Sequence, residues 1–358
     1  MKLTTAGESH GPALVGIVTG LPAGLVLDRD AINADLARRQ QGYGRSPRQK
    51  LEQDEVEVLA GLRHGRTLGT PLALVVRNRD HKNWAWGMSP WPPEGDPDGK
   101  GTKPVTLPRP GHADLAGSMK YGLADARDAL ERASARQTAV AVAAGAVAKA
   151  LLAAIGISVE GRVVTEDLEQ RIDKARVERD TVGGVVEVVA RGVPPGLGSY
   201  AAKDDRLDAR LAGALMGIQA VKGVEIGAGF ELAGRRGSEA HDEIVADEQG
   251  ALHRETNFAG GIEGGVSNGE DVVVRAAMKP LPTLMRPLRS VDLETGEPGE
   301  ALVERSDVAA VEALAVVAEA AVAFELARAA REKFGGDALG DFVAAHRAYV
   351  ERIPWRTR

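Results

Sequence analysis

The stretch TAVAVAAGAVAKALLAAI at residues 138–155 is the most apolar run in the chain, and alanine, valine and leucine dominate it. Because Lys149 interrupts this run, it indicates a buried helix and not a membrane span. We expect the helix to begin near Leu115 or Tyr121 and to end at Ile155. A second long helix is expected from Asp307 to Phe334, where a Gly-Gly pair stops it. Interiors rich in alanine let two such helices pack closely.

Other apolar runs in the chain are rich in β-branched residues, which predict strands. The expected strands are 12–19, 56–62, 72–76, 183–191 and 224–232, and shorter helices are expected at 28–40 and 206–218. Strands mixed with helices of this length indicate an α+β or α/β fold. The order helix, strand, glycine-rich loop and strand occurs at 30–76 and again at 206–276, so an internal duplication is one hypothesis.

The composition limits the class of protein. The chain has 358 residues, of which 44% are hydrophobic and 27% charged, so it has one large globular domain or two ordinary ones. A net charge of −6 argues against binding of nucleic acid or an anionic membrane by the chain as a whole. Cysteine is absent, which excludes disulfides and thiolate metal sites, and no His/Asp/Glu spacing resembles a metal site. The N-terminal segment has no apolar run of signal-peptide length, so we expect a cytoplasmic protein.

The sharpest charged cluster surrounds Gly42-Tyr43-Gly44. It contains Arg38, Arg39, Arg45, Arg48 and Lys50, and the segment 29–50 carries six positive charges against two negative ones. Guanidinium groups bind phosphate and carboxylate in bidentate fashion, and the glycines let the backbone approach a ligand. The cluster therefore predicts a site for a small, multiply charged anion. The alternative is a solvated basic helix end.

Two histidines stand beside glycines. Ser9 and His10 lie in GESHG at 7–11, and His112 lies in RPGHAD at 109–114, directly after the proline- and glycine-rich segment 84–108. We expect that segment to be a long loop, which is usually functional or mobile. Histidine is the side chain best suited to proton transfer near neutral pH. Each histidine alone could be structural, but the pair favours catalysis.

Further motifs add polar groups to apolar surroundings. RASAR at 132–136 places two arginines and a serine in the first long helix, and a buried arginine needs an anionic partner. The glycine-dense segment 260–269 could hold a phosphate, although it lacks the Walker and Rossmann patterns. KPLPT at 279–283 fixes an extended backbone. Asp307 is either a helix N-cap or a catalytic group. These residues together indicate an enzyme acting on a phosphorylated, carboxylated metabolite.

The motifs at 7–11, 39–45, 109–114, 132–136 and 279–283, in this order, closely resemble those of the chorismate synthase family, and the resemblance extends from residue 1 to about 330. It implies conversion of 5-enolpyruvylshikimate 3-phosphate to chorismate and phosphate by trans-1,4 elimination, the last step of the shikimate pathway. The reaction needs reduced FMN without net redox change. The resemblance also implies a homotetramer of single-domain chains (1–358) with an α+β fold, a βαβ sandwich whose central layer of long helices lies between sheets. An internal pseudo-repeat of about 1–155 and 156–335 is compatible with this fold.

The same resemblance implies a role for each matching residue. His10 would protonate the leaving phosphate, His112 the N1/C2 carbonyl edge of the flavin, and Asp307 would accept from N5, while Ser9 and Ser134 relay protons. The residues that would hold the substrate are Arg39, Arg45, Arg48 and Arg136. Those that would hold FMN are Arg132, Ala133, Ser134, Gln219, Ala220, Gly264, Lys279, Pro280, Leu281, Pro282, Thr283 and Arg305.

The chain departs from the family pattern at a few positions. Gln137 replaces a common glutamate, Ser46-Pro47 replaces a glycine pair, and Ala309 or Ala310 stands where cysteine is frequent. None of these changes removes a catalytic candidate. Two rival functions remain at this stage, a flavoprotein oxidoreductase that oxidises a nicotinamide cofactor and an RNA-binding protein that uses segment 29–50. The net charge and the few aromatic residues argue against the second. An added reduction of flavin by NADPH stays open.

Overall fold

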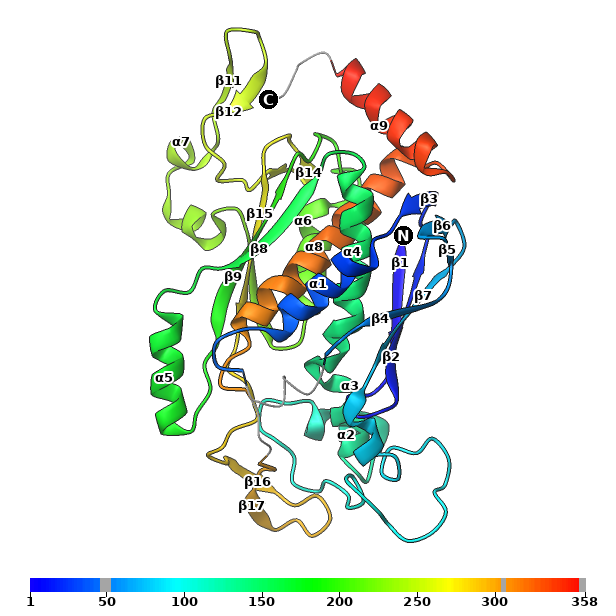
Figure 1. Cartoon of the computed structure of the whole chain (residues 1–358). Helices are drawn as coiled ribbons and strands as arrows, with labels where there is room; N and C mark the ends of the chain where they lie inside the picture. Colours follow the sequence, from blue (N-terminus) through cyan, green and yellow to red (C-terminus); the bar gives the residue numbers. More distant parts are fainter. Residues whose placement is uncertain (46–52, 304–306, 354–358) are drawn as a thin grey trace.

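The architecture is a sandwich in which two antiparallel sheets enclose a layer of helices (Figure 1). The computed structural model describes residues 1–45, 53–303 and 307–353. The central helices are α1 (Arg29–Gln40), α4 (Thr138–Ala153) and α8 (Val311–Phe334). The α+β fold with a central helical layer, expected from the sequence, is therefore confirmed.

The first sheet has the order β1-β2-β7-β4 and covers α4. Its strands are β1 (Lys2–Ala6), β2 (Ala13–Thr19), β4 (Val56–Ala60) and β7 (Leu72–Arg77). Alternate residues of β2 are buried, as expected for a strand with one face on the core. Gly16 belongs to the buried face, where an added Cβ would come within 2.8 Å of Val140 on α4. A small three-stranded sheet beside it contains β3 (Ala23–Val26), β5 (Leu62–Arg63) and β6 (Arg66–Leu68).

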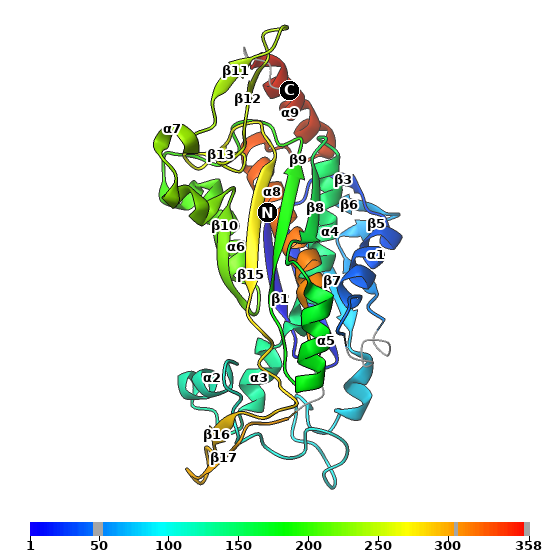
Figure 2. The same ribbon diagram turned by 90° about the vertical axis from the view of Figure 1, so that its left-hand side faces the viewer.

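The second sheet has the order β8-β9-β15-β10 and covers α8 (Figure 2). Its strands are β8 (Ser158–Val163), β9 (Gly184–Arg191), β10 (Val221–Ile226) and β15 (Val272–Met278). Helix α6 (Leu207–Met216) lies between β9 and β10 in the chain, just as α1 lies between β2 and β4. In each sheet, the first strand in the chain pairs with the second, the second with the fourth, and the fourth with the third. The two sheets thus share one topology.

The core lies where α4 and α8 pack against each other. Gly145 of α4 lies so close to Ala320 of α8 that a Cβ on it would come within 2.3 Å of the Ala320 side chain. Small side chains permit this close approach, while Val140 of α4 reaches Gly16 of β2 and Val311 of α8 reaches Gly184 of β9.

The remaining elements extend the two ends of the sandwich (Figure 2). The helices are α2 (Asp114–Tyr121), α3 (Arg127–Ala133), α5 (Leu168–Glu178), α7 (Gly237–Ala240) and α9 (Leu339–Arg352). The 3-10 segments are η2 (Arg79–Asn83), η3 (Ala135–Gln137), η4 (Lys203–Asp205) and η5 (Gly229–Gly234). The hairpins pair β11 (Ile244–Ala246) with β12 (Leu252–Arg254), β13 (Ile262–Glu263) with β14 (Val266–Ser267), and β16 (Arg289–Val291) with β17 (Pro298–Glu300).

The first long helix expected from the sequence is wrong as one element, because the chain forms α2, α3, η3 and α4 instead. Gly122 ends α2 in the left-handed conformation, with φ 66°. Ser134 then ends α3 with an extended backbone, and its hydroxyl accepts the amide hydrogen of Arg136 to begin η3. The RASAR motif therefore lies at a break between helices.

Two other boundaries differ from the expectation. Helix α8 begins at Val311 with Ala310 as its N-cap, so Asp307 is not the cap. The strand expected at 224–232 ends at Ile226, since Gly227 has φ 58° and η5 follows. The expected helix at 28–40 is confirmed, and the Asp28 carboxylate accepts the amide hydrogen of Asp30 to cap it.

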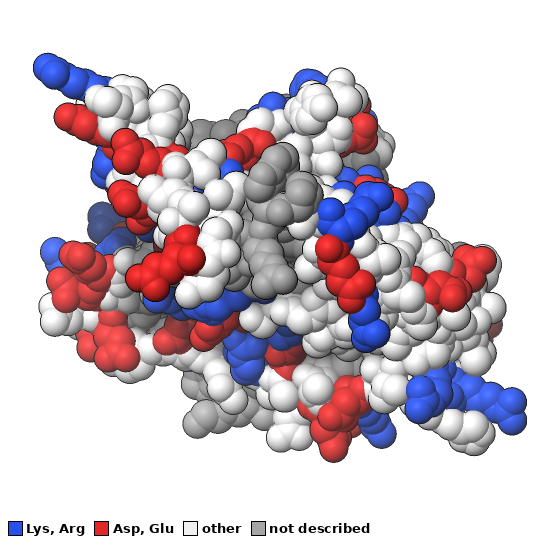
Figure 3. Space-filling model, turned by 90° about the horizontal axis from the view of Figure 1, so that it is seen from above, with Lys and Arg blue, Asp and Glu red and all other residues white. Residues whose placement is uncertain are grey.

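The surface carries both signs of charge. On the face seen from above, acidic and basic side chains are interspersed (Figure 3), in line with the small net charge. Within the described ranges, one helical stretch, Arg127–Ala153, has the length and composition to cross a membrane, but 72% of its most apolar window is buried inside the protein. It includes α4, so it serves as a core helix.

Candidate active site

A cavity of about 310 Å³ lies at one end of the central helical layer. The ends of α1, β15 and η3 contribute to its lining, together with the start of α8 and the loops before β2 and α2. The cavity brings together many of the residues singled out from the motifs: Ser9, His10, Arg39, Arg45, His112, Ser134, Arg136, Gln219, Leu281, Pro282, Thr283 and Asp307.

Two of the arginines share one buried carboxylate. Arg39 at the end of α1 and Arg136 in η3 both form ion pairs with Asp54, at 3.1 and 2.7 Å. The Nε of Arg39 also donates to the hydroxyl of Thr138, and that of Arg136 donates to Asn78 at 2.8 Å. These contacts fix both guanidinium groups, so an anion would meet a preformed pair of donors.

Arg45 enters the cavity from the loop after α1. Its guanidinium pairs with Asp307 at 2.7 Å, while its buried Nε has no hydrogen-bond partner among the residues that the structure describes. The loop is held by Glu312, which accepts the amide hydrogen of Tyr43 at 2.5 Å. Gly42 has φ 134°, and a Cβ at this position would collide with the Glu312 carboxylate. The glycine therefore permits the close approach that places Arg45.

The described residues that line the cavity carry an excess of positive charge. They include four arginines, Arg39, Arg45, Arg109 and Arg136, and one carboxylate, that of Asp307, while Asp54 and Asp114 behind the lining offset part of the charge. Burial lowers the pKa of Arg39 to about 10, and the neighbouring guanidinium groups of Arg136 and Arg45 act in the same direction. Asp54 compensates only part of this unfavourable environment. An anionic ligand would supply the missing negative charge.

His10 is held on several sides. Its ring Nδ1 lies 2.8 Å from one carboxylate oxygen of Glu131, and its amide donates to the other at 2.8 Å. Its ring stacks on Trp84, with a centroid distance of 3.9 Å. The carbonyl of His10 also lies 2.9 Å from Nδ1 of His81 in η2. His10 is 7% exposed, so the ring is nearly immobilised beside the cavity.

His112 has a comparable carboxylate partner. Its Nδ1 lies 2.5 Å from Asp114, which also pairs with Arg109 at 2.8 Å. Burial by itself would raise the pKa of Asp114, but the hydrogen bonds from His112 and Arg109 outweigh it and hold the pKa well below its usual range. Because Asp114 is ionised, Nδ1 of His112 carries a hydrogen and Nε2 is the nitrogen left for a ligand.

The break between α3 and α4 separates the residues of RASAR. The Ser134 hydroxyl donates to that of Ser9 at 3.2 Å, so both serines lie at the cavity. Arg132 turns away from it and donates to the carbonyls of Thr5 and Gly7. Arg132 also contacts Gln137, whose amide group donates to the carbonyl of Gly7 at 2.6 Å. The first arginine therefore fastens the chain before β2, and the second lines the cavity.

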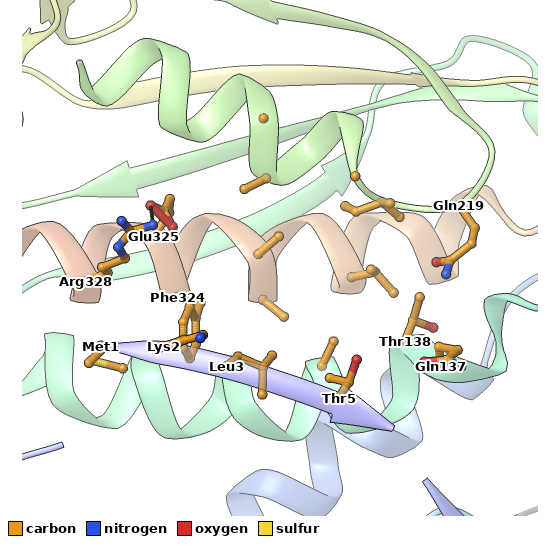
Figure 4. Close-up of a pocket in the computed structure, with 18 of the residues that line it drawn as sticks. Met1, Lys2, Leu3, Thr5, Gln137, Thr138, Gln219, Phe324, Glu325 and Arg328 are labelled. Carbon is orange, nitrogen blue, oxygen red and sulfur yellow. Dashed lines mark hydrogen bonds and ion pairs between the residues drawn. The ribbon is translucent and has the colours of Figure 1, made fainter. Parts of the chain in front are cut away.

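A larger cavity of about 910 Å³ adjoins the first, with Thr138, Ile218, Gln219 and Val317 lining both. It extends along α8, with β1 on one side and α6 on the other (Figure 4). Gln137, Thr138 and Gln219 lie at one end, and Met1, Glu325 and Arg328 at the other (Figure 4). Arg132 lines this cavity and not the smaller one.

The remaining residues assigned to the cofactor lie in several places. The Lys279 ammonium donates to the carbonyl of Gly111 at 2.7 Å, and its amide donates to the carbonyl of Ala220. Pro280 follows Lys279 in the loop after β15, and Ala133 is the last residue of α3. Gly264 lies in the β13–β14 turn, at the end of β15 opposite to Met278, so the chain does not bring it to the smaller cavity. Arg48 and Arg305 lie outside the described residues.

Arg38 does not belong to the site although it precedes Arg39. Its guanidinium pairs with Glu319 of α8 at 2.9 Å and with Asp35. Lys149 of α4 joins the same carboxylates, so these four residues connect α1, α4 and α8. Neighbouring residues on a helix point about 100° apart, and only one of the two arginines can reach the cavity.

The motifs did not predict a role for five side chains that line the cavity or hold its residues in place: Asp54, Trp84, Arg109, Asp114 and Glu131. Arg109 and Asp114 flank His112 inside a quoted motif, and Glu131 directly precedes RASAR. A carboxylate beside a histidine motif was the available signal for Asp114. For Glu131 the chain offers no comparable signal, because it lies 121 residues from His10.

The fold and the cavity define an α+β protein that can hold a small polyanion beside two carboxylate-bound histidines. The family model "Chorismate synthase" matches residues 1–330. A chorismate synthase of Desulforudis audaxviator is 53% identical, covering 99% of this chain and 98% of the relative. One of Rubrobacter xylanophilus is 54% identical, covering 98% and 96%. The solved structure "Crystal Structure of Chorismate Synthase" has a TM-score of 0.77 and 37% identity, covering 98% of this chain and 97% of that one. The chain therefore belongs to the chorismate synthase family, whose members are lyases.

Proposed function

We propose that this chain converts 5-enolpyruvylshikimate 3-phosphate to chorismate and inorganic phosphate, using reduced FMN without net redox change. The observation that carries the proposal is the single cavity in which four arginines and two carboxylate-bound histidines meet. The substrate has one phosphate and two carboxylates, which matches the excess of positive charge. Arg39, Arg45 and Arg136 would hold these groups, and Arg48, outside the described residues, is assigned with them by family resemblance.

The elimination breaks the bond between C3 and the phosphate oxygen, and the electron pair of the C6–H bond enters the new diene. The C6 hydrogen leaves as a proton, which balances the proton given to the phosphate. We assign His10 to protonate the phosphate as negative charge develops on the leaving oxygen. Ser9 and Ser134, which are hydrogen-bonded to each other, would relay or fix protons beside it. His112 and Asp307 are assigned to hold protons at the N1/C2 carbonyl edge and N5 of the flavin. Reduced FMN, when held by these residues, would supply the transient electron donation that makes loss of phosphate easier, and it would be recovered unchanged.

The lining residues fit a flavin. Met278, Leu281, Pro282 and Leu314 give the smaller cavity an apolar part suited to a ring, and Gln219 lies where the two cavities meet. We propose that Arg132, Ala133, Ser134, Gln219, Ala220, Lys279, Pro280, Leu281, Pro282, Thr283 and Arg305 hold FMN. Arg132 reaches only the adjoining larger cavity, and the position of Gly264 in a single chain gives no support to its assignment.

The decisive assay mixes the protein anaerobically with 5-enolpyruvylshikimate 3-phosphate and chemically reduced FMN, and follows chorismate and phosphate. Equal amounts of the two products are expected, without net oxidation of the flavin. Absence of both products under these conditions would overturn the proposal. A parallel reaction with oxidised FMN and NADPH tests whether the chain also reduces its own flavin. Net consumption of NADPH without chorismate would favour a flavoprotein oxidoreductase.

Replacing either histidine tests its chemical role. We expect His10→Ala and His112→Ala each to lower kcat at least about tenfold, the low end of what general acid–base groups contribute. Circular dichroism should show that both variants remain folded. Wild-type activity in both variants would show that the histidines are structural.

We also propose a cytoplasmic homotetramer, on the basis of family resemblance. Light scattering coupled to gel filtration measures the mass of the assembly, and a mass close to that of the 37.6 kDa chain would contradict the tetramer.

A further proposal is that the chain forms one domain from two repeats, about 1–155 and 156–335. The shared strand order of the two sheets supports the repeat, as does the position of α1 and α6 within each half.

A further inference from the structure

Glu131 is the buried group in contact with His10 that the proposed reaction has not used. It is 1% exposed and does not line either cavity, so it has no direct access to a substrate. Both of its carboxylate oxygens are nevertheless engaged by His10, one by the ring Nδ1 and the other by the backbone amide. Its own carbonyl accepts the amide hydrogen of Ser9 at 3.1 Å. One residue of α3 thus holds the backbone and the ring of the GESHG loop.

We propose that Glu131 is a positioning residue that keeps His10 in the orientation and tautomer required for protonating the leaving phosphate. This inference rests on the proposed function. An ionised carboxylate at Nδ1 requires a hydrogen on that nitrogen, which directs Nε2 to the ligand. The second oxygen of the same carboxylate accepts the amide hydrogen of His10, so the ring and its backbone are fixed together.

The surroundings of the ring agree with this role. Trp84 covers one face of His10, and its indole N–H donates to Asp80 at 3.0 Å. Arg127 lies over the Trp84 ring at 5.2 Å and 3.8 Å from Glu131, so it competes with His10 for the carboxylate. The other charged or titratable groups around His10 are His81, Lys100 beyond Trp84, and the arginines, His112 and Asp307 of the cavity. Glu131 contacts the ring directly, with its carboxylate 2.8 Å from Nδ1.

The primary test compares Glu131→Gln with wild type in the anaerobic assay. We expect kcat to fall about 10- to 100-fold, the usual cost of losing such a partner, with KM changed less than about twofold. Glu131→Asp keeps the carboxylate but sets it one methylene further from Nδ1, so its kcat should lie between those of Glu131→Gln and wild type. Glu57→Gln on β4 is the control, because Glu57 is a partly exposed glutamate that pairs with Arg77 instead of a histidine, and it should behave as wild type.

A double-mutant cycle separates positioning from general structural support. In a His10→Ala background, Glu131→Gln should cause no further loss of kcat, because its target is gone. A full additional loss there would overturn the proposal. If Glu131→Gln does not fold, Glu131→Asp replaces it in both backgrounds, since the displaced carboxylate should lower kcat only where His10 is present. An equal loss of kcat in both backgrounds would then reject the proposal. Wild-type inactivity would instead reject the proposed function.

Discussion

The two histidines of the cavity are held in the same manner although they belong to unrelated segments. Nδ1 of His10 contacts Glu131, and Nδ1 of His112 contacts Asp114, and both carboxylates are buried. In each pair the carboxylate selects the tautomer and leaves the second ring nitrogen for chemistry. The arginines follow a related rule, because Asp54 and Asp307 hold them in place without neutralising the whole group.

The buried contacts of Asp114 with Arg109 and His112 should make the free energy of unfolding depend on pH. The depressed pKa means that Asp114 stabilises the fold above its unfolded-state pKa of about 3.8, and that this contribution is lost as pH falls below it. We expect Asp114→Asn to lower the free energy of unfolding by about 3 kcal/mol at pH 7. The difference from wild type should narrow below about pH 4, as measured by urea unfolding at several pH values.

Asp128 is a control, because its pKa is shifted upward whereas that of Asp114 is shifted downward. Burial raises its pKa, and the neighbouring Asp125 adds to the effect, so its ionised form is unfavourable at neutral pH. Asp128→Asn should therefore leave the free energy of unfolding at pH 7 unchanged or slightly higher. A constant difference between Asp114→Asn and wild type across the whole pH range would contradict the assigned ion pair.

Substitution of Arg39 tests whether substrate binding needs a guanidinium group at this position or only a positive charge. A lysine at this position cannot reproduce the separate contacts to Thr138, Asp54 and the Ala135 carbonyl. We expect Arg39→Lys to raise KM for 5-enolpyruvylshikimate 3-phosphate roughly tenfold or more, the cost of one charged hydrogen bond. Arg29→Lys, on the exposed side of the same helix, should leave KM unchanged. Equal KM values for both variants would exclude Arg39 from anion binding.

At the scale of elements, the break between α3 and α4 creates much of the site. A continuous helix would point Ser134 and Arg136 in directions set by helical periodicity alone. The extended backbone of Ser134 and the 3-10 turn after it instead bring both side chains to the cavity, while Arg132 fastens β1 and the loop after it. The apolar part of the run then continues as α4, where close packing on α8 determines its position.

That close packing can be tested at Gly145. A Cβ there would lie 2.6 Å from the Cα of Ala320, so the two helices would have to separate. We expect Gly145→Ala to lower the free energy of unfolding by about 1–3 kcal/mol, despite the better helix propensity of alanine. Gly213→Ala in α6, where the added atom meets open space, should raise it by about 0.4–1 kcal/mol. If both substitutions raise the free energy of unfolding, a methyl group fits between α4 and α8 without separating them.

At the scale of the whole molecule, two similar sheets share one helical layer. Helix α4 follows the first sheet in the chain and α8 follows the second, yet each contacts the other more than it contacts any other element. A site at the end of this layer can therefore take residues from both halves, and Arg39 and Asp307 provide an example. Neither half could keep its long helix covered alone.

The shared layer predicts cooperative unfolding. Because separation of the halves would expose α4 and α8 together, we expect one calorimetric transition for the full chain, at the same temperature as the loss of helical circular dichroism. Two resolved transitions would show that the halves are independently stable. The Gly145→Ala variant should lower the temperature of the whole transition and not split it.

Local patterns predicted several elements because their causes are local. Asp28 caps α1, and alternating or β-branched runs correspond to β2, β7 and β9. The prediction of one helix across residues 121–155 failed because the hydroxyl of Ser134 and the contacts of Arg132 outweigh helix propensity at that point. The charge pattern alone did not separate Arg38 from Arg39, although the family resemblance assigned only Arg39 to the substrate, and the ion pair of Arg38 with Glu319 gives the physical reason.

The amino-acid sequence by itself determined the order of the motifs, the alternation of strands and helices, and a local excess of arginine in an acidic chain. These properties depend on residue type and on short spacings. Only the tertiary structure decided that Glu131 contacts His10, that Asp54 serves two arginines, and that Gly264 lies far from the smaller cavity. Such pairings join distant segments, and they depend on how α4, α8 and the two sheets pack, which no short stretch of sequence encodes.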